Sequence, residues 1–290
     1  MGTASYQLLP GKVALVTGGA AGIGEAISKV FARHGAHVVV NGLPGDPVQD
    51  VVREIQALRG SAIGIEADVA TEVGARSAVD LAIQTFGKLD ILIANAGIFP
   101  EQHEIPEFPP ERFEEVLHSN IRGVFYSVRA ALPALRDTRG VILGAGSEAG
   151  LMGVSEAATY AASKGWVHAF IRSVAAEQSK YGIRANVVAP GPIDTEMTRP
   201  TKGHMKVKTA LIEERSPLFG RRGTPEEVAN MYLFLASDLA SYCTGGIYMV
   251  DGGATTTTVM SGVEAKSEAK QAPEGTVELK HQYAGRGTLS

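Results

Sequence analysis

The sequence predicts a single α/β domain, in which helices cover both faces of a doubly wound parallel sheet. Short apolar runs, typical of buried parallel strands, alternate with helix-like stretches along the chain. No linker interrupts this alternation before residue 254, and no internal repeat is present. The alternation favours right-handed crossovers within one sheet. We therefore expect one domain over residues 11–256, with a short extension before it (1–10) and a polar extension after it (257–290).

About seven strands are expected, and a helix-like stretch follows each of the first six. The apolar runs are Lys12–Thr17, Val38–Val40, Ala62–Ile65, Leu89–Ala94, Val141–Leu143, Arg184–Val188 and Gly246–Val250. Each is short enough for a strand that is buried on both faces.

A glycine-rich turn follows the first apolar run. Gly18, Gly19, Gly22 and Gly24 precede a helical pattern. The order strand, glycine turn, helix makes a nucleotide-binding motif credible. The missing side chains would let the backbone approach a pyrophosphate, and the helix N-terminus would offer free N–H groups. The alternative is a glycine-rich surface turn.

Tyr160 and Lys164 are four residues apart, which places them on one face of a helix. The ammonium group, helped by the positive ring of a bound cofactor, can lower the phenol pKa from its usual value of about 10. Ser147 lies upstream and could hydrogen-bond the oxygen of a reacting carbonyl or alcohol. Taken alone, the Tyr-x-x-x-Lys pair is equally consistent with a helix face that carries both residues by chance.

Together the motifs resemble those of the short-chain dehydrogenase/reductase family, from about Gly11 to Gly253. The matching pieces are Thr17–Gly24, Asp68–Val69, Asn95–Gly97, Asn120, Ser147, Tyr160 with Lys164, Pro190–Thr195 and Asp251–Gly253. Several spaced motifs in one order are far more specific than any single motif. The resemblance implies a Rossmann-type fold and reversible hydride transfer between a nicotinamide cofactor and a secondary alcohol or its ketone.

The resemblance also implies roles for four residues. Tyr160 would be the general acid and base, and Lys164 would lower its pKa and hold the cofactor ribose hydroxyls. Ser147 would position and polarise the substrate oxygen. Asn120 would hold a helix backbone and a water that relays protons from Lys164. The chain departs from the common pattern at Gly146, which replaces a frequent second serine.

Residues that would contact the cofactor follow from the same resemblance. They are Gly18, Ala21, Gly22, Ile23 and Gly24 in the glycine turn, Gly42 in the second strand region, Asp68 and Val69 around the adenine, Asn95, Ala96 and Gly97 along the adenosine, Tyr160 and Lys164, Pro190 and Gly191, and Ile193 and Thr195 near the nicotinamide carboxamide.

NAD is expected in preference to NADP. Gly42 occupies the place where an aspartate would mark NAD, so the acidic residue is missing. However, no Lys or Arg stands at Ala21 or anywhere in residues 41–46, and Asp46 would repel a 2′-phosphate nearby. Without a cation, little would offset the desolvation of that phosphate. The absent basic partner therefore outweighs the absent acid.

The substrate is expected to be a small to medium molecule bound by loops at the carboxyl ends of the strands. These loops are residues 98–103, 148–155 and 196–216, which mix apolar and polar groups. They are compatible with a polyol or sugar and equally with a cyclic ketone or steroid. His103 and His204 lack fixed ligand spacing, so no metal site is expected.

Composition excludes several classes of protein. The net charge of −4 and the lack of a basic run give no support for nucleic acid as a partner. The single Cys243 excludes an internal disulfide framework and a cysteine-based zinc site. No secretory segment and no membrane-length apolar run is present, so a cytoplasmic enzyme without a membrane partner is expected. The alternative is a non-enzymatic nucleotide-binding scaffold or regulator, which would have little need for the Asn-Ser-Tyr-Lys set.

A homotetramer is expected, because residues 112–135 and 157–181 carry apolar groups around more than one helical stripe. Resembling enzymes pair these helices across a two-fold axis, with a second contact through residues 226–236 and 246–250. The tail from Ser261 to Ser290 has balanced charge and few large apolar groups, so a solvated extension or a cover on another subunit is expected. Within it, Thr276–Lys280 alternates and could form a short strand.

Overall fold

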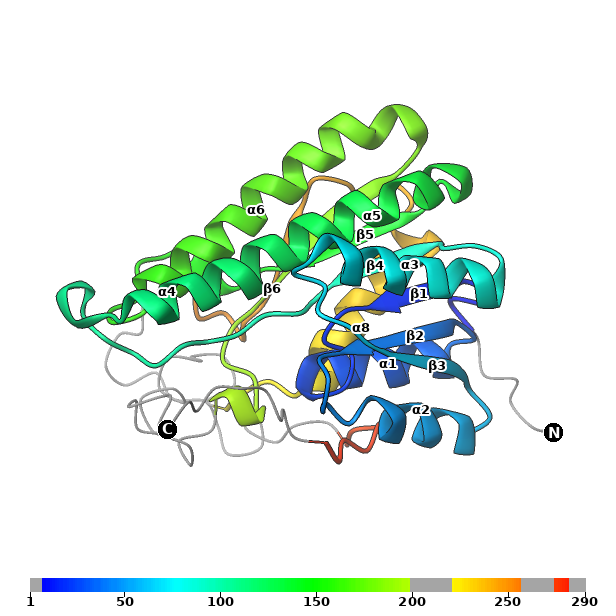
Figure 1. Cartoon of the computed structure of the whole chain (residues 1–290), viewed down its shortest axis with the longest axis horizontal. Coiled ribbons are helices and arrows are strands. Elements are labelled where there is room, and N and C mark those ends of the chain that lie inside the picture. The colour runs from blue at the N-terminus through cyan, green and yellow to red at the C-terminus, as the bar shows by residue number, and fades with distance from the viewer. Residues whose placement is uncertain (1–6, 199–220, 257–273, 282–290) are drawn as a thin grey trace.

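The computed structural model describes residues 7–198, 221–256 and 274–281. Its centre is a seven-stranded parallel sheet with the strand order β3-β2-β1-β4-β5-β6-β7, covered by helices on both faces (Figure 1). The strands are β1 (Val13–Val16), β2 (His37–Gly42), β3 (Ser61–Glu66), β4 (Ile91–Ala94), β5 (Val141–Ala145), β6 (Arg184–Pro190) and β7 (Ile247–Val250). The predicted fold class is confirmed, and each strand overlaps an apolar run of the sequence.

The helices form two layers with a core beneath each. One layer contains α1 (Gly22–Arg33), α2 (Val48–Ala57) and α8 (Pro225–Ala236); the other contains α3 (Glu72–Phe86), α5 (Gly123–Thr138) and α6 (Ala158–Gln178). The helix α4 (Pro110–Val116) leads through the π-helical turn η2 (Leu117–Arg122) into α5. Short 3-10 turns are η1 (Ile105–Glu107), η3 (Glu148–Gly150), η4 (Ser179–Tyr181), η5 (Glu196–Thr198) and η7 (Asp238–Ala240).

Strand side chains alternate between the two cores. In β1, Val13 and Leu15 pack with α3 and α5, whereas Ala14 and Val16 pack with α1 and α8. All four side chains are buried. Each fully buried large aliphatic side chain contributes about 1.5–3 kcal/mol to folding. This double burial explains why the strands appear as continuous apolar runs in the sequence.

The order of the strands reverses between β1 and β4. From β1 the chain adds β2 and then β3 on one side, and it returns to place β4 on the other. At such a point the loops after the two central strands leave in opposite directions, and a crevice opens at the carboxyl ends. The topology therefore places a binding cleft beside the glycine turn.

Two local expectations need correction. Residues 112–135 are not one regular α-helix, because η2 inserts a π-helical turn that contains Asn120. Thr276–Lys280 is not a strand: the backbone N–H groups of Thr276 and Val277 donate to the carboxylate of Glu226 and do not pair with another strand. Among the helices of the described segments, none is long and apolar enough to cross a membrane.

Candidate active site

A cleft of about 980 Å³ opens at the carboxyl ends of the strands. Every residue that the sequence assigns to the cofactor lines it, as do Ser147, Tyr160 and Lys164. Asn120 does not line the cleft and lies buried behind its wall. The fold therefore brings together residues from the ends of six strands and from two helices.

The glycine turn forms a cradle that side chains would fill. Gly18 and Gly22 have φ values of +60° and +55°, which L-residues with side chains rarely adopt. A Cβ atom on Gly24 would lie 1.9 Å from the carbonyl oxygen of Gly18. No side chain caps α1 at Ala21, which leaves the first N–H groups of the helix to an anion. The cradle therefore fits the pyrophosphate of a dinucleotide.

Thr17 and Asn95 brace this cradle from the ends of β1 and β4. The Asn95 amide donates to the carbonyl oxygens of Thr17 and Gly18 at 3.0 and 3.2 Å. The Thr17 hydroxyl accepts from the N–H groups of Asn95 and Ala96 and donates to the carbonyl of Ile93. Asn95 thus positions the turn as well as lining the cleft. Thr17 was not among the expected site residues, although it begins the glycine motif.

Burial controls the ionisation of the predicted catalytic pair. Burial raises the pKa of Tyr160 to about 12; a hydrogen bond from Ser147 opposes this shift and the Glu148 carboxylate adds to it. Burial also lowers the pKa of Lys164 to about 8. The Lys164 ammonium donates to the carbonyl of Ala145 at 2.9 Å and lies 5.6 Å from the centre of the Tyr160 ring. Protein groups alone therefore do not produce the lowered phenol pKa that the sequence suggested.

Asn120 acts on the backbone of the cleft wall. Its side chain forms a two-point contact with Ile98, accepting from the N–H at 2.8 Å and donating to the carbonyl at 3.0 Å. It also donates to the hydroxyl of Ser163, which in turn donates to the carbonyl of Tyr160. The π-helical turn aims the amide inward, a placement often found at functional sites. Asn120 thereby connects the loop after β4 to the helix that carries Tyr160.

His168 lies beneath Ser147, and the sequence analysis missed it. Its Nε2 accepts from the backbone N–H of Ser147 at 3.4 Å. Burial and, to a smaller degree, the nearby Lys164 ammonium lower the pKa of His168 to about 4, so the ring is neutral near pH 7. His168 follows Lys164 by one helical turn, and this i, i+4 spacing on the face of Tyr160 is the signal that could have identified it.

His168 also explains why residue 146 is a glycine and not the serine that is frequent in the family pattern. A Cβ atom on Gly146 would lie 2.4 Å from Nε2 of His168 and 2.6 Å from a methyl carbon of Val187. A second serine cannot fit there while the imidazole occupies this space. Gly146 and His168 are therefore a matched pair beneath the serine.

At the adenosine end, a carboxylate stands close to Gly42. A Cβ atom on Gly42 would lie 3.0 Å from Oδ2 of Asp46. This carboxylate accepts from the N–H of Leu43 at 2.7 Å, and the Glu66 carboxylate accepts from Gly45 at 3.1 Å. Burial raises the pKa of Asp46, the hydrogen bond from Leu43 lowers it, and Glu66 raises it. The cleft thus has a carboxylate, that of Asp46, beside the position where residue 42 carries none.

Asp68, at the expected adenine position, has partners within the protein. One carboxylate oxygen lies 2.8 Å from Nε2 of His118, and the other accepts from the N–H of Ala70. Val69 beside it packs into the core under α3 and α5. Both residues still line the cleft.

The expected substrate loops are only partly described. The Nε2 atom of His103 lies 3.5 Å from Glu101, and exposed Leu151 and Met152 lie outside the lining of the cleft. Of the third loop, Glu196 and Met197 line the cleft. His204 and the rest of that loop from residue 199 lie outside the described residues.

Comparison with known proteins agrees with this geometry. A family model described as enoyl-(acyl carrier protein) reductase matches residues 18–255. L-rhamnose 1-dehydrogenase (NAD(P)(+)) from Sphingomonas sp. is 39% identical over 250 residues, covering 85% of this chain and 97% of the relative. Cyclohexanol dehydrogenase from Acinetobacter sp. is 38% identical over 245 residues, covering 84% and 95%. The solved structure of 7α-hydroxysteroid dehydrogenase with NADH and 7-oxo glycochenodeoxycholic acid superposes with a TM-score of 0.79 at 33% identity, covering 87% and 98%.

The steric match between Gly146 and His168 predicts the effect of introducing a serine at position 146. Gly146→Ser should force His168 or Ser147 to move, and turnover should fall by about a hundredfold, the scale of a displacement near 1 Å. Dinucleotide binding should change little, because the glycine cradle is untouched. Steady-state turnover and binding titrations would measure both effects.

The control is the double variant Gly146→Ser/His168→Ala, in which the imidazole is removed. It should regain much of the lost turnover. A double variant no better than Gly146→Ser alone would contradict the steric coupling.

Proposed function

Because the chain belongs to the short-chain dehydrogenase/reductase family, and so is an oxidoreductase that transfers hydride between a nicotinamide cofactor and an alcohol or ketone, we propose that Tyr160 is its general acid and base. The observation that carries this proposal is that Ser147, Tyr160 and Lys164 line the same cleft as the glycine cradle of α1. The enzymatic relatives argue against the non-enzymatic scaffold considered from the sequence.

In alcohol oxidation, Ser147 would hydrogen-bond the substrate oxygen while Tyr160 takes the hydroxyl proton. Phe99 packs edge-on against the Tyr160 ring, with 4.7 Å between the ring centres, and fixes the direction of the phenol. The nicotinamide would accept the hydride and, in its oxidised form, place a positive charge in the cleft. In ketone reduction, Tyr160 would return the proton.

The ionisation of Tyr160 sets what its neighbours must do. In the protein alone, burial and the Glu148 carboxylate outweigh the hydrogen bond from Ser147, so the phenol stays neutral with its pKa at about 12. Each unit by which the pKa falls requires about 1.36 kcal/mol in favour of the phenolate. The Lys164 ammonium would supply part of this through the low-dielectric wall, and its own lowered pKa leaves it able to exchange a proton near pH 8. Asn120 would hold the loop after β4 and the helix α6 in place through its hydrogen bonds to Ile98 and Ser163.

We infer that the cofactor is NAD in preference to NADP. Asp46 stands at the place of the missing acidic residue, and Glu66 adds a second carboxylate beside it. A ribose hydroxyl can donate to a carboxylate, whereas a 2′-phosphate would be repelled. Two cations, Arg122 and Lys280, also line the cleft but come from other elements. Neither adjoins residues 41–46 in the sequence.

We infer that the substrate carries its CH–OH group on a ring. The names of the three relatives indicate L-rhamnose, cyclohexanol and a steroid, all ring compounds with secondary alcohols. The mixed polar and apolar lining of this cleft, with Glu196 and Met197 at one side, suits such a molecule. Absorbance of reduced nicotinamide over a panel of sugars, cyclic alcohols, steroids and acyl thioester ketones would test this class.

We infer further that the chain forms a homotetramer. A band of aromatic side chains lies on α5 and α6: Trp166 stacks on Phe170 at 4.6 Å, and Phe125, which is 41% exposed, lies 6.1 Å from Phe170. Such a band is suited to pairing with its copy across a two-fold axis. That pairing would also brace the helix that carries Tyr160 and Lys164.

Tyr160→Phe should lower turnover by at least about a hundredfold, because the variant has no proton to exchange. Dinucleotide affinity, measured from the fluorescence of the reduced cofactor, should stay close to that of the parent. Turnover near the parent level would remove Tyr160 from this role.

Asp46→Asn should raise catalytic efficiency with NADP relative to NAD by about tenfold, because it removes the charge beside the ribose and keeps an acceptor for Leu43. Catalytic efficiencies with the two cofactors give the ratio. Asp80→Asn is the matched control, since Asp80 is exposed on α3 and does not line the cleft. An unchanged ratio in Asp46→Asn, or a clear NADP preference of the parent, would contradict the inference.

Light scattering at micromolar concentration should give a tetramer mass for the parent chain. Phe125→Asp should dissociate it, because the carboxylate would be buried without a partner at the two-fold contact. Val73→Asp, on the exposed face of α3, should leave the mass unchanged. A monomeric parent would refute the assembly.

A further inference from the structure

A segment of the C-terminal extension lies against the cofactor cleft. Residues 274–281, here called the strap, form the red trace beside α2 in Figure 1. Leu279, Lys280 and His281 line the cleft together with the glycine turn. Val277 and Leu279 pack against the core beneath α1 and α8. The strap is thus part of the cleft wall, although it follows the family domain in the sequence.

The beginning of the strap is held by α8 and α1. The carboxylate of Glu226 accepts from the N–H groups of Thr276 and Val277 at 2.7 and 2.9 Å. The Arg33 guanidinium donates to the hydroxyl and the carbonyl of Thr276. Three of these four contacts use backbone groups of the strap, so they depend on its path more than on its side chains.

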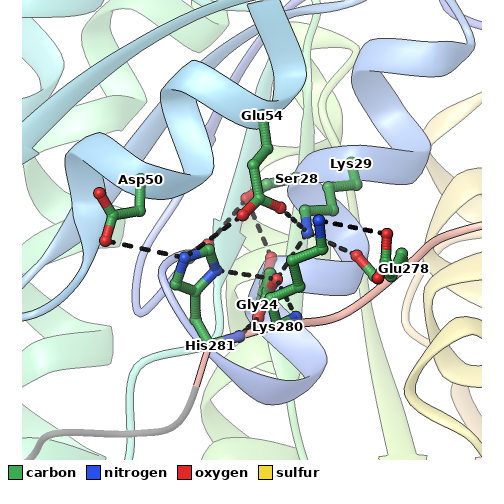
Figure 2. A network of polar contacts seen from close by, with 10 residues as sticks. Gly24, Ser28, Lys29, Asp50, Glu54, Glu278, Lys280 and His281 are labelled. Carbon is green, nitrogen blue, oxygen red and sulfur yellow. Dashed lines mark hydrogen bonds and ion pairs between the residues drawn. The ribbon is translucent and has the colours of Figure 1, made fainter. Parts of the chain in front are cut away.

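The end of the strap is held by the first turns of α1. The Lys29 ammonium donates to the carbonyl of Glu278 at 2.6 Å. The Glu25 carboxylate accepts from the backbone N–H groups of Lys280 and His281 at 3.2 and 3.3 Å. Figure 2 shows these contacts as one network between α1, α2 and the strap.

Glu25 is the critical member of this network. It directly follows Gly24 in the cradle, and its side chain is 0% exposed. Its countercharge Lys29 is shared, because the ammonium lies 2.7 Å from both Glu25 and Glu54. A buried carboxylate at the helix N-terminus competes with a pyrophosphate for the same positive end of the helix.

The His281 ring of the strap also faces the negative charge of Glu25. Its ring nitrogens lie 3.2 Å from Glu25, 3.5 Å from Glu54 and 3.8 Å from Asp50 (Figure 2). Around Glu25 the strap therefore provides two N–H donors and an imidazole. Without them, the carboxylates of Glu25 and Glu54 would share the single ammonium of Lys29.

Glu25, Glu54 and His281 also have the spacing of a metal-binding group. However, the Lys29 ammonium already contacts both carboxylates at 2.7 Å. A metal ion would need the same oxygens and would face the ammonium charge. The contacts therefore form a network in which the strap offsets the negative charge of the Glu25 carboxylate.

We propose that the strap is a component of the cofactor site: by compensating Glu25 at the start of α1, it strengthens binding of the dinucleotide pyrophosphate. This proposal rests on the proposed function, since it requires a dinucleotide in the cradle. The pyrophosphate is common to NAD and NADP, so the strap strengthens binding of both. The backbone of Lys280 carries the effect, and its ammonium, 3.3 Å from Glu278, does not.

The test compares two full-length variants. In one, residues 274–281 are replaced by a Gly/Ser sequence of equal length; in the matched control, residues 282–290 are replaced in the same way. The first should weaken binding of NAD and NADP alike by about tenfold, the scale of lost hydrogen bonds to a charged group. The control should bind as the parent does. Calorimetry measures the affinities without turnover.

Two point variants separate the mechanism from general damage. Glu25→Gln removes the charge, so strap replacement in that background should change affinity by less than about twofold. Lys280→Ala removes the ammonium but keeps the backbone donors, so its affinity for both dinucleotides should fall far less than after strap replacement. Trypsin digestion of the parent should show slower cleavage after Lys280 when either dinucleotide is present.

The outcomes distinguish the two proposals. A parent chain that binds neither dinucleotide would overturn the proposed cofactor and with it the role of the strap. Normal binding by the parent, with equal or tighter binding after strap replacement, would overturn the strap alone. A loss of affinity confined to NADP, or a loss in Lys280→Ala as large as that after strap replacement, would also overturn it by assigning the effect to the ammonium.

Discussion

The close approach of α1 to the ends of β1 and β4 is the constraint on which the rest of the structure depends. Gly24 sits where any side chain would collide with the carbonyl of Gly18, and Asn95 holds that same carbonyl. The helix must therefore meet the sheet with almost no tolerance in the backbone, at the point where the strand order reverses. The result is a helix N-terminus without a side-chain cap that faces a cleft.

In the opposite wall of the cleft, burial determines the ionisation of the side chains more than neighbouring charges do. The helix α6 carries Tyr160, Lys164 and His168 at successive turns, and each is removed from water to a degree that disfavours its charged form. In such a wall, a cation placed near the phenol lowers the phenol pKa strongly, because little solvent screens the interaction. A bound positive ring would therefore favour the phenolate form that the proposed role of Tyr160 requires.

Segments that are distant in the sequence complete the cleft. His168 fills the space beneath Ser147 that Gly146 leaves open, so one glycine and one histidine act as a unit. The strap reaches Glu25 from more than two hundred residues away and lies beside the cradle. In both cases a buried polar group acquires its partner from another element, as buried polar groups require.

The sequence by itself determined the sheet, its layers and much of the lining of the cleft. Seven apolar runs became seven strands because parallel strands are buried on both faces, and that burial is visible in composition alone. The spaced motifs identified the lining because each follows a strand, and all carboxyl ends of a parallel sheet meet at one edge. Local spacing also placed Tyr160 and Lys164 on one helical face.

Only the tertiary structure decided the contacts between elements. The direction of the Tyr160 pKa shift depends on burial, which no local pattern reveals. The carboxylate of Asp46 beside Gly42, the imidazole beside Gly146 and the strap on Glu25 all depend on how loops and helices pack. Such contacts are non-local, and sequence spacing carries no information about distances between segments that meet only after the chain has folded.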